Sequence, residues 1–251
     1  LAGSEWLGAR ANLLEVDIQG TQAVVEAAAQ AGVSRFLTVS HLGADRASAY
    51  PVLTAKAIAE AHIRRSGIPH TILRAAVVFG PGDGFTTGLA LLAHAVPFVF
   101  LLPGSGDTLI QPLWVEDLAT CLVWALENER TLDQTIEVGG PEYLTFRQVV
   151  ETVLAEIRLD RTLVPMRQPY LRGLTVTMEA VVARLPVSVF WLDYLATHRT
   201  CALDTIPRVF GLLPARLTSR LDYLRGVDWG RELRRTLFRR RKRQRRTSGG
   251  V

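Results

Sequence analysis

The sequence predicts an α/β protein built on a parallel β-sheet with helices packed on its faces. Two observations lead to this fold class. Short apolar, β-branched runs typical of buried strands alternate with longer segments in which apolar residues recur at helical spacing. Glycines also follow directly after several of the helical segments, where helices commonly end. Such alternation indicates βαβ units, in which each crossover helix packs against the sheet.

The first part of the chain supplies the clearest alternation. Apolar spacing predicts a helix over 13–31, which Gly32 ends. The run 35–40 predicts a buried strand, 51–66 a second helix, and 70–77 a second strand. We therefore expect these two strands to be central, parallel neighbours with the two helices beside them.

Later segments continue the pattern and then depart from it. We expect further helices and strands over 85–95, 108–114, 115–126 and 134–140, and a helix for which Thr145 is the N-cap. After Arg161, short amphipathic helices separated by prolines are predicted over 169–184, 188–198 and 204–225. This divides the chain into a partial sheet domain (1–160), a helical cap or docking region (161–229) and a basic disordered tail (230–251).

The net charge of +5 is unevenly distributed. Residues 230–251 contain ten Lys or Arg and a single acid, Glu232, so the remainder is mildly acidic. That body carries no basic face of the kind nucleic acids require, and a nucleic-acid partner is not expected. The tail leaves several interpretations open: attraction to an anionic membrane surface or a protein complex, nonspecific RNA or DNA contact, or simple solvation.

Composition also bears on the compartment and on metals. Cys121 and Cys201 cannot form a disulfide framework, which favours a reducing compartment. The five histidines lack the spacing of metal ligands, so no metal cofactor is expected. No secretory signal is recognised, and no apolar run reaches the roughly 20 residues of a spanning helix. We expect a cytoplasmic protein, with peripheral membrane contact as an alternative.

Four segments and one lysine carry a family resemblance over about residues 1–160. In chain order they are DIQGTQAVVEAAAQAGVSRFLTVSHLGA, Lys56, TILRAAVVFGPGDGF, QPLWVEDLA and VGGPEYLTFRQ. In this order they resemble the extended and atypical short-chain dehydrogenase/reductase superfamily, especially NAD(P)H-binding proteins similar to the nucleotide-binding accessory subunit of respiratory complex I. The resemblance implies a Rossmann-like fold and a nicotinamide dinucleotide, NAD or NADP, as cofactor.

The same family begins with a glycine-rich turn that holds the cofactor pyrophosphate at a helix N-terminus. No GxxGxxG motif is present in this sequence. Leu1-Ala2-Gly3 is similar to the end of the motif that follows the first unit in the family, which places Gly3 among the cofactor contacts. We therefore expect an N-terminally incomplete domain that binds NAD or NADP only if the missing unit is present.

The resemblance implies a catalytic Ser, Tyr and Lys, the last two at Tyr-x-x-x-Lys spacing. Ser40 and Lys56 stand at the serine and lysine places, but Val52 takes the tyrosine place. Tyr50 precedes Lys56 by six residues, about 600° of helical rotation, which points it to a different face.

Each of these residues keeps two interpretations. Tyr50 is either an acid that a loop turns inward or a loop tyrosine packed on the helix start. Lys56 either contacts the cofactor ribose or is a solvated helix lysine. Ser40 is either catalytic and cofactor-binding or a strand-end cap.

Two further features come from the resemblance. Asp17 stands where the family usually has Asn, and because an ionised Asp only accepts hydrogen bonds, the family's water relay is in doubt. The backbone of Ala75, Ala76 and Val77 is implied to contact the nicotinamide carboxamide, with an ordinary buried strand as the alternative.

Two functions follow. The first is an NAD(P)-binding protein that retains weak or degenerate oxidoreductase or epimerase activity on an unidentified small molecule. The alternative is a non-catalytic nucleotide-binding scaffold or assembly subunit of a membrane-associated complex. Val52 at the tyrosine place favours the second, and Ser40 with Lys56 favours the first.

Overall fold

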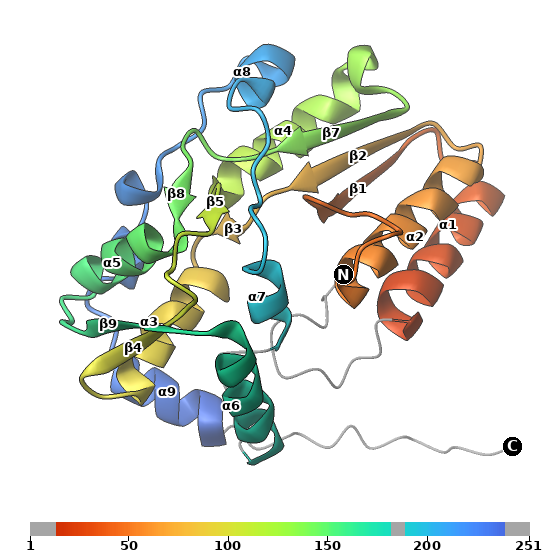
Figure 1. Ribbon diagram of the computed structural model, residues 1–251. Coiled ribbons are helices and arrows are strands. Elements are labelled where there is room, and N and C mark those ends of the chain that lie inside the picture. The colour runs from red at the N-terminus through yellow and green to blue at the C-terminus, as the bar shows by residue number, and fades with distance from the viewer. Residues whose placement is uncertain (1–13, 182–188, 239–251) are drawn as a thin grey trace, which may run out of the picture.

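The computed structural model describes residues 14–181 and 189–238. It contains a three-stranded parallel sheet in the order β1-β2-β7, with bounds Phe36–His41, His70–Ala75 and Gln134–Val138 (Figure 1). Phe36 is aligned with His70, and Ala75 with Val138. The predicted parallel pairing of 35–40 with 70–77 is confirmed, and so is the Rossmann-like α/β fold class.

Helices cover both faces of this sheet. Helices α1 (Gly20–Gln30) and α2 (Pro51–Arg65) lie on one face and α4 (Val115–Glu127) on the other (Figure 1). Ile72 of β2 packs with Ile63 of α2, whereas its neighbour Leu73 packs with Cys121 of α4. Because successive side chains of a strand point to opposite faces, β2 is buried on both, as a central parallel strand must be.

The predicted N-terminal helix is not uniform. Leu14–Gln19 form a π-helical turn, η2, and regular α-helix begins only at Gly20. The helix ends where expected, since Gly32 adopts a left-handed φ of 66° just beyond it. π-Helical turns are rare and often occur at functional sites, and nothing in the local spacing indicates one here.

The second half of the chain adds short strands. The predicted strand 108–114 is two strands, β5 (Leu109–Ile110) and β6 (Leu113–Trp114), because Pro112 interrupts the ladder. Strand β5 pairs antiparallel with β8 (Leu144–Thr145), and β6 pairs parallel with β3 (Val78–Phe79). Strands β4 (Val99–Pro103) and β9 (Thr162–Met166) form a parallel pair that the sequence analysis did not predict.

Two predicted helices of this half are confirmed. Helix α3 spans Phe85–Ala95, and α5 spans Phe146–Glu156. The Thr145 side chain accepts a hydrogen bond from the Gln148 amide, and the Gln148 side chain returns one to the Thr145 amide. This reciprocal capping box is the N-cap expected of Thr145.

The C-terminal region departs further from expectation. Helices α6 (Gln168–Val181) and α7 (Val189–Tyr194) fall in predicted helical segments. The predicted helix 204–225 is wrong, because α8 (Thr205–Phe210) ends at Gly211 with a φ of 68°. An extended stretch and two 3₁₀ turns, Leu217–Ser219 and Asp222–Leu224, complete that segment.

The predicted basic tail also needs a correction at its start. Trp229–Phe238 form helix α9, and the buried Trp229 belongs to the hydrophobic core of the second half. Apolar burial outweighs the local charge there. Gly3 and residues 239–251 lie outside the described ranges. Among the described helices, none combines the length and apolar character needed to cross a bilayer.

Candidate functional site

The carboxyl ends of β1, β2 and β7 lie at one edge of the sheet. Ser40, Ala75 and Val138 stand at or next to these strand ends. Open parallel α/β sheets bind ligands outside this edge. The predicted site residues Ser40 and Ala75–Val77 lie at or next to this edge.

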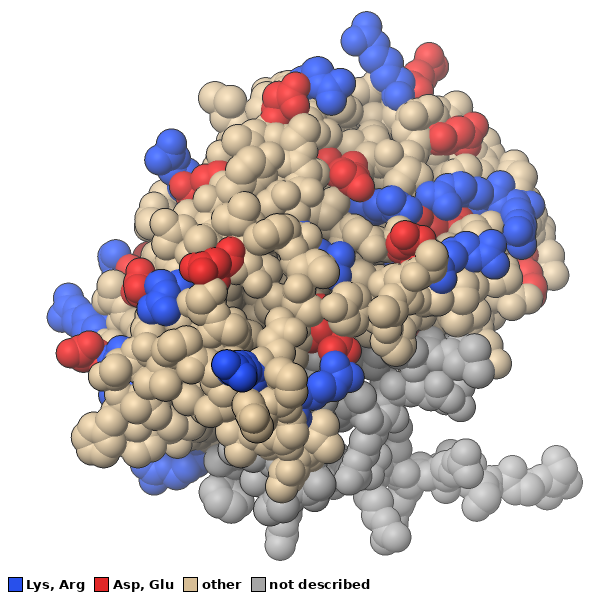
Figure 2. Space-filling view, in the orientation of Figure 1, with Lys and Arg blue, Asp and Glu red and all other residues tan. Residues whose placement is uncertain are grey.

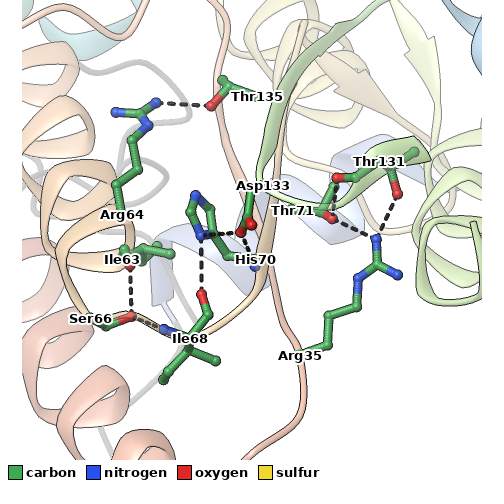
Figure 3. A network of polar contacts seen from close by, with 10 residues as sticks. All are labelled: Arg35, Ile63, Arg64, Ser66, Ile68, His70, Thr71, Thr131, Asp133 and Thr135. Atoms are coloured by element: carbon green, nitrogen blue, oxygen red, sulfur yellow. Dashed lines mark hydrogen bonds and ion pairs between the residues drawn. The ribbon is translucent and has the colours of Figure 1, made fainter. Parts of the chain in front are cut away.

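The opposite edge of the sheet holds a structural polar network (Figure 3). Arg35 donates hydrogen bonds to the hydroxyls of Thr71 and Thr131, and Asp133 accepts one from the His70 amide. These contacts join the segments that lead into the three strands. They account for this cluster of polar residues without a ligand.

Lys56 and Asp17 form an ion pair beside the carboxyl edge. The Lys56 Nζ lies 2.7 Å from the Asp17 Oδ1, and both side chains are largely buried, with 18% and 6% exposed. Asp17 reaches this position from the π-helical turn η2, and Lys56 from the middle of α2. The second carboxylate oxygen of Asp17, Oδ2, is buried and accepts no hydrogen bond from the described residues.

Ser40 is buried at the end of β1, beside a charged network centred on Glu60. The Glu60 carboxylate accepts hydrogen bonds from Arg64 and Arg74. Burial by itself would raise the pKa of Glu60, but the hydrogen bonds from these two arginines outweigh it and hold that pKa below its ordinary value. The Ser40 hydroxyl itself has no hydrogen-bond partner among the described residues.

Tyr50 immediately precedes α2. Its ring faces Arg199, whereas Lys56 is paired with Asp17. The Arg199 guanidinium carbon lies 5.9 Å from the Tyr50 ring centre and 5.6 Å from that of Tyr194. Among the described hydrogen bonds, none joins the Tyr50 hydroxyl to Ser40 or Lys56. The structure therefore brings Lys56 to Asp17 and brings Tyr50 to Arg199.

Arg199 is a feature that sequence reasoning missed. It is 8% exposed, and burial lowers the pKa of its guanidinium. Its Nε and Nη2 atoms have no hydrogen-bond partner in the described chain. Gly43 makes room for it, since a Cβ there would lie 2.4 Å from Nη1. No spacing rule could relate Arg199 to Tyr50 or Gly43, because each lies about 150 residues away in sequence.

The backbone of Ala75–Val77 is partly engaged by the sheet. The Ala75 carbonyl accepts from Leu42, the Ala76 amide donates to Val138, and the Val77 carbonyl accepts from Leu113. The Ala76 carbonyl and the Val77 amide have no backbone partner within the described residues. One acceptor and one donor therefore remain at this strand end, which matches the needs of a primary carboxamide.

Two neighbouring motifs have structural roles. In the GPGDG run, the Asp83 carboxylate accepts hydrogen bonds from the Thr86 and Thr87 amides and so caps α3. Asp117 accepts a 2.7 Å hydrogen bond from the Ala215 amide, which anchors the C-terminal segment to α4. Both carboxylates are therefore engaged in structural hydrogen bonds.

A parallel sheet with helices on both faces is a Rossmann-like α/β arrangement. Residues 4–96 match the sequence model of the family described as NAD(P)H-binding. This stretch of the chain is therefore similar to NAD(P)H-binding domains.

Curated relatives include subunit 9 of the NADH dehydrogenase (ubiquinone) 1 alpha subcomplex, mitochondrial. The Arabidopsis thaliana protein is 29% identical over 178 residues, 68% of this chain and 44% of that protein. The Rattus norvegicus protein is 32% identical over 152 residues, 59% of this chain and 40% of that protein. The chain thus spans less than half the length of these relatives.

Solved structures agree with the fold. A nucleoside-diphosphate-sugar epimerase from Staphylococcus aureus is 15% identical with a TM-score of 0.67, covering 85% of this chain and 73% of that one. An NADPH-dependent quinone oxidoreductase from Escherichia coli, complexed with NADPH, is 18% identical with a TM-score of 0.66, covering 82% and 71%. At these identities the likeness establishes the fold alone.

Proposed function

We propose that this chain is part of an NAD(P)-binding protein of the atypical short-chain dehydrogenase/reductase type, with weak or absent hydride-transfer activity. The observation that carries the proposal is the Lys56–Asp17 pair at the carboxyl edge. Lys56 offers N–H donors, and the Asp17 Oδ2 offers an acceptor with no described partner. A ribose diol, which both donates and accepts hydrogen bonds, is complementary to this pair.

The strand end beside this pair fits the other part of the cofactor. The Ala76 carbonyl and the Val77 amide would hold the nicotinamide carboxamide through one accepted and one donated hydrogen bond. When bound, the nicotinamide ring supplies or receives a hydride. The buried backbone here would fix the ring's orientation, because Ala75, Ala76 and Val77 are each at most 6% exposed.

Weak or absent hydride-transfer activity is proposed because the groups needed for proton transfer are not brought together. Hydride delivery to a carbonyl leaves charge on its oxygen, which a positioned acid must neutralise. Tyr50 faces Arg199, and the buried Ser40 hydroxyl has no hydrogen-bond partner among the described residues. Neither hydroxyl is hydrogen-bonded to Lys56 within the described part of the chain, and the Lys56 ammonium is paired with Asp17. The chain therefore retains groups for holding a cofactor better than groups for moving a proton.

A scaffold role remains the second candidate, and the relatives favour it. Several are named as subunits of a mitochondrial NADH dehydrogenase, and one from Trieres chinensis, 28% identical over 131 residues, is named a photosystem II assembly factor. We propose that the protein binds a nucleotide as part of a membrane-associated complex, peripheral to the membrane. The basic segment 230–251 is the contact that the sequence predicts for this role.

Nucleotide titration of the full-length protein tests the proposal. Lys56→Met should weaken NADH or NADPH binding by about 10- to 100-fold, through loss of charge-assisted hydrogen bonds worth roughly 1–3 kcal/mol. Arg65→Met removes a charge from the same helix at an exposed position and should leave the affinity unchanged. Equal affinities for the Lys56→Met variant and the wild type would exclude Lys56 from the site.

Catalysis is tested separately. Tyr50→Phe should leave both nucleotide affinity and any residual reductase activity unchanged. A selective loss of activity in that variant would show that Tyr50 is a working acid and would favour the enzyme over the scaffold.

A further inference from the structure

The molecule contains an apolar cavity whose lining includes neither Lys56 nor Asp17. It is a cavity of about 250 Å³ between helices α3, α6 and α7 and strand β4. In Figure 1, α3, β4 and α6 lie in the lower part of the molecule, with α7 above α6. Nothing in the nucleotide function proposed above uses this cavity.

The lining of the cavity is almost entirely apolar. Of the seventeen lining residues, sixteen are aliphatic, aromatic, proline or glycine, and none is charged. Thr175 is the one polar residue among them, and its hydroxyl donates a 2.9 Å hydrogen bond to the Leu171 carbonyl of its own helix. The described lining therefore presents no side chain that needs a polar ligand.

This lining determines the chemical class of the ligand. An ordered water needs about two to four polar partners, and apolar cavities without them stay dry. A phosphate, a sugar or an ion would lose its hydration here and gain no compensating hydrogen bond. Only hydrocarbon is complementary. The volume of about 250 Å³ exceeds the ~150 Å³ of an apolar cavity that takes up benzene.

The cavity walls are preformed and reach the surface. Phe85 of α3 and Trp191 of α7 stack with ring centres 5.2 Å apart. Leu174 of α6 lines the cavity and is also 40% exposed, and Tyr170 on the preceding turn is 70% exposed. The apolar wall thus continues to the outside along α6. A chain can enter there while a polar head group stays in water.

We propose that this cavity binds the hydrocarbon chain, acyl or prenyl, of an amphiphilic ligand. The α3–β4 wall and helices α6 and α7 hold the chain, and the head group lies outside along α6. In Figure 2, positive and negative side chains are interspersed over the visible face. The proposal goes beyond the nucleotide function and does not depend on it.

The test uses dansylundecanoic acid, a fluorescent fatty acid, with the full chain. Wild type should bind it with a blue-shifted, enhanced emission. Unlabelled decanol should displace it if the site takes a linear acyl chain, and geraniol if it takes a prenyl chain, whereas UDP-glucose should displace nothing. Displacement by UDP-glucose, or by neither alcohol, would overturn the proposal.

Cavity-filling variants locate the probe. Thr175→Phe should weaken binding by at least about tenfold, roughly 1.4 kcal/mol, because its ring occupies the cavity. Val176→Phe places the same ring on the exposed side of the same helix and should bind like wild type. Leu192→Trp fills the cavity from α7 and serves as a second variant if Thr175→Phe fails to fold, as judged by near-ultraviolet circular dichroism. Wild-type affinity in a folded filling variant would refute the assignment.

Discussion

Arg74 in the sheet and Arg199 in the C-terminal region experience opposite surroundings. The Arg74 Nε and Nη2 atoms donate hydrogen bonds of 3.0 and 2.8 Å to the two oxygens of Glu60, and this bonding raises the pKa of the guanidinium. In Arg199 the same two nitrogens have no described partner, and burial lowers the pKa. The rings of Tyr50 and Tyr194 are the groups that face its charge within the described residues.

The comparison shows which of the two partly buried guanidinium groups has its lost hydration replaced by hydrogen bonds. A buried guanidinium bonded to both carboxylate oxygens is compensated for its lost hydration, whereas one that meets only aromatic rings is compensated in part. Natural proteins tend to retain such local costs where a site needs them. Arg199 lies against Tyr50 and Gly43, two residues of the segment that follows β1. Its incompletely compensated charge is therefore buried next to the segment that joins β1 to α2.

Removing Glu60 should produce the largest effect. Glu60→Ala leaves Arg74 and Arg64 without their carboxylate and should destabilise the fold by about 3 kcal/mol in urea unfolding. The pKa of Glu60 is lowered in the folded state, so its contribution is present above the ordinary value of 4.5 and is lost as pH falls through the lowered one. The difference between variant and wild type should therefore shrink in acid.

Glu137→Ala is the matched control for Glu60. Glu137 is 46% exposed and lies 3.9 Å from Arg74, so its loss should change stability by less than about 1 kcal/mol. Equal costs for the two variants would contradict the central role of Glu60.

Replacing Arg199 should act in the opposite direction. Arg199→Met removes an incompletely compensated buried charge while keeping apolar volume, and it should stabilise the fold by about 1–2 kcal/mol, seen as a higher urea midpoint. Arg220→Met is its control, because Arg220 is exposed and lies 5.7 Å from the Trp114 ring, and its effect should stay within about 1 kcal/mol. A destabilised Arg199→Met would show that the two tyrosine contacts outweigh desolvation.

The smallest effect concerns a charge-free contact. Thr145→Ala removes one half of the capping box of α5 and should cost about 1 kcal/mol. Thr152→Ala removes a hydroxyl that only donates back to the Gln148 carbonyl within the same helix, so it should be close to neutral. Thermal unfolding of both variants would compare a cap with a mid-helix hydroxyl of the same chemistry.

The sequence by itself determined those features that neighbouring residues control. Helix α2 begins at Pro51, α3 spans Phe85–Ala95, and Thr145 caps α5, all as local spacing and cap chemistry predict. The parallel pairing of β1 and β2 followed from the alternation of helices and strands, because a crossover helix between two strands of one sheet makes them parallel. The family motifs likewise identified the nucleotide-binding class and directed attention to Lys56.

Only the tertiary structure decided which side chains meet. Lys56 pairs with Asp17, 39 residues earlier in the chain, because the π-helical turn η2 presents that carboxylate to α2. Tyr50 meets Arg199, and β4 pairs with β9 across 63 residues from Val99 to Thr162. Contacts over such separations depend on how whole elements pack, and no periodicity or short motif encodes that packing.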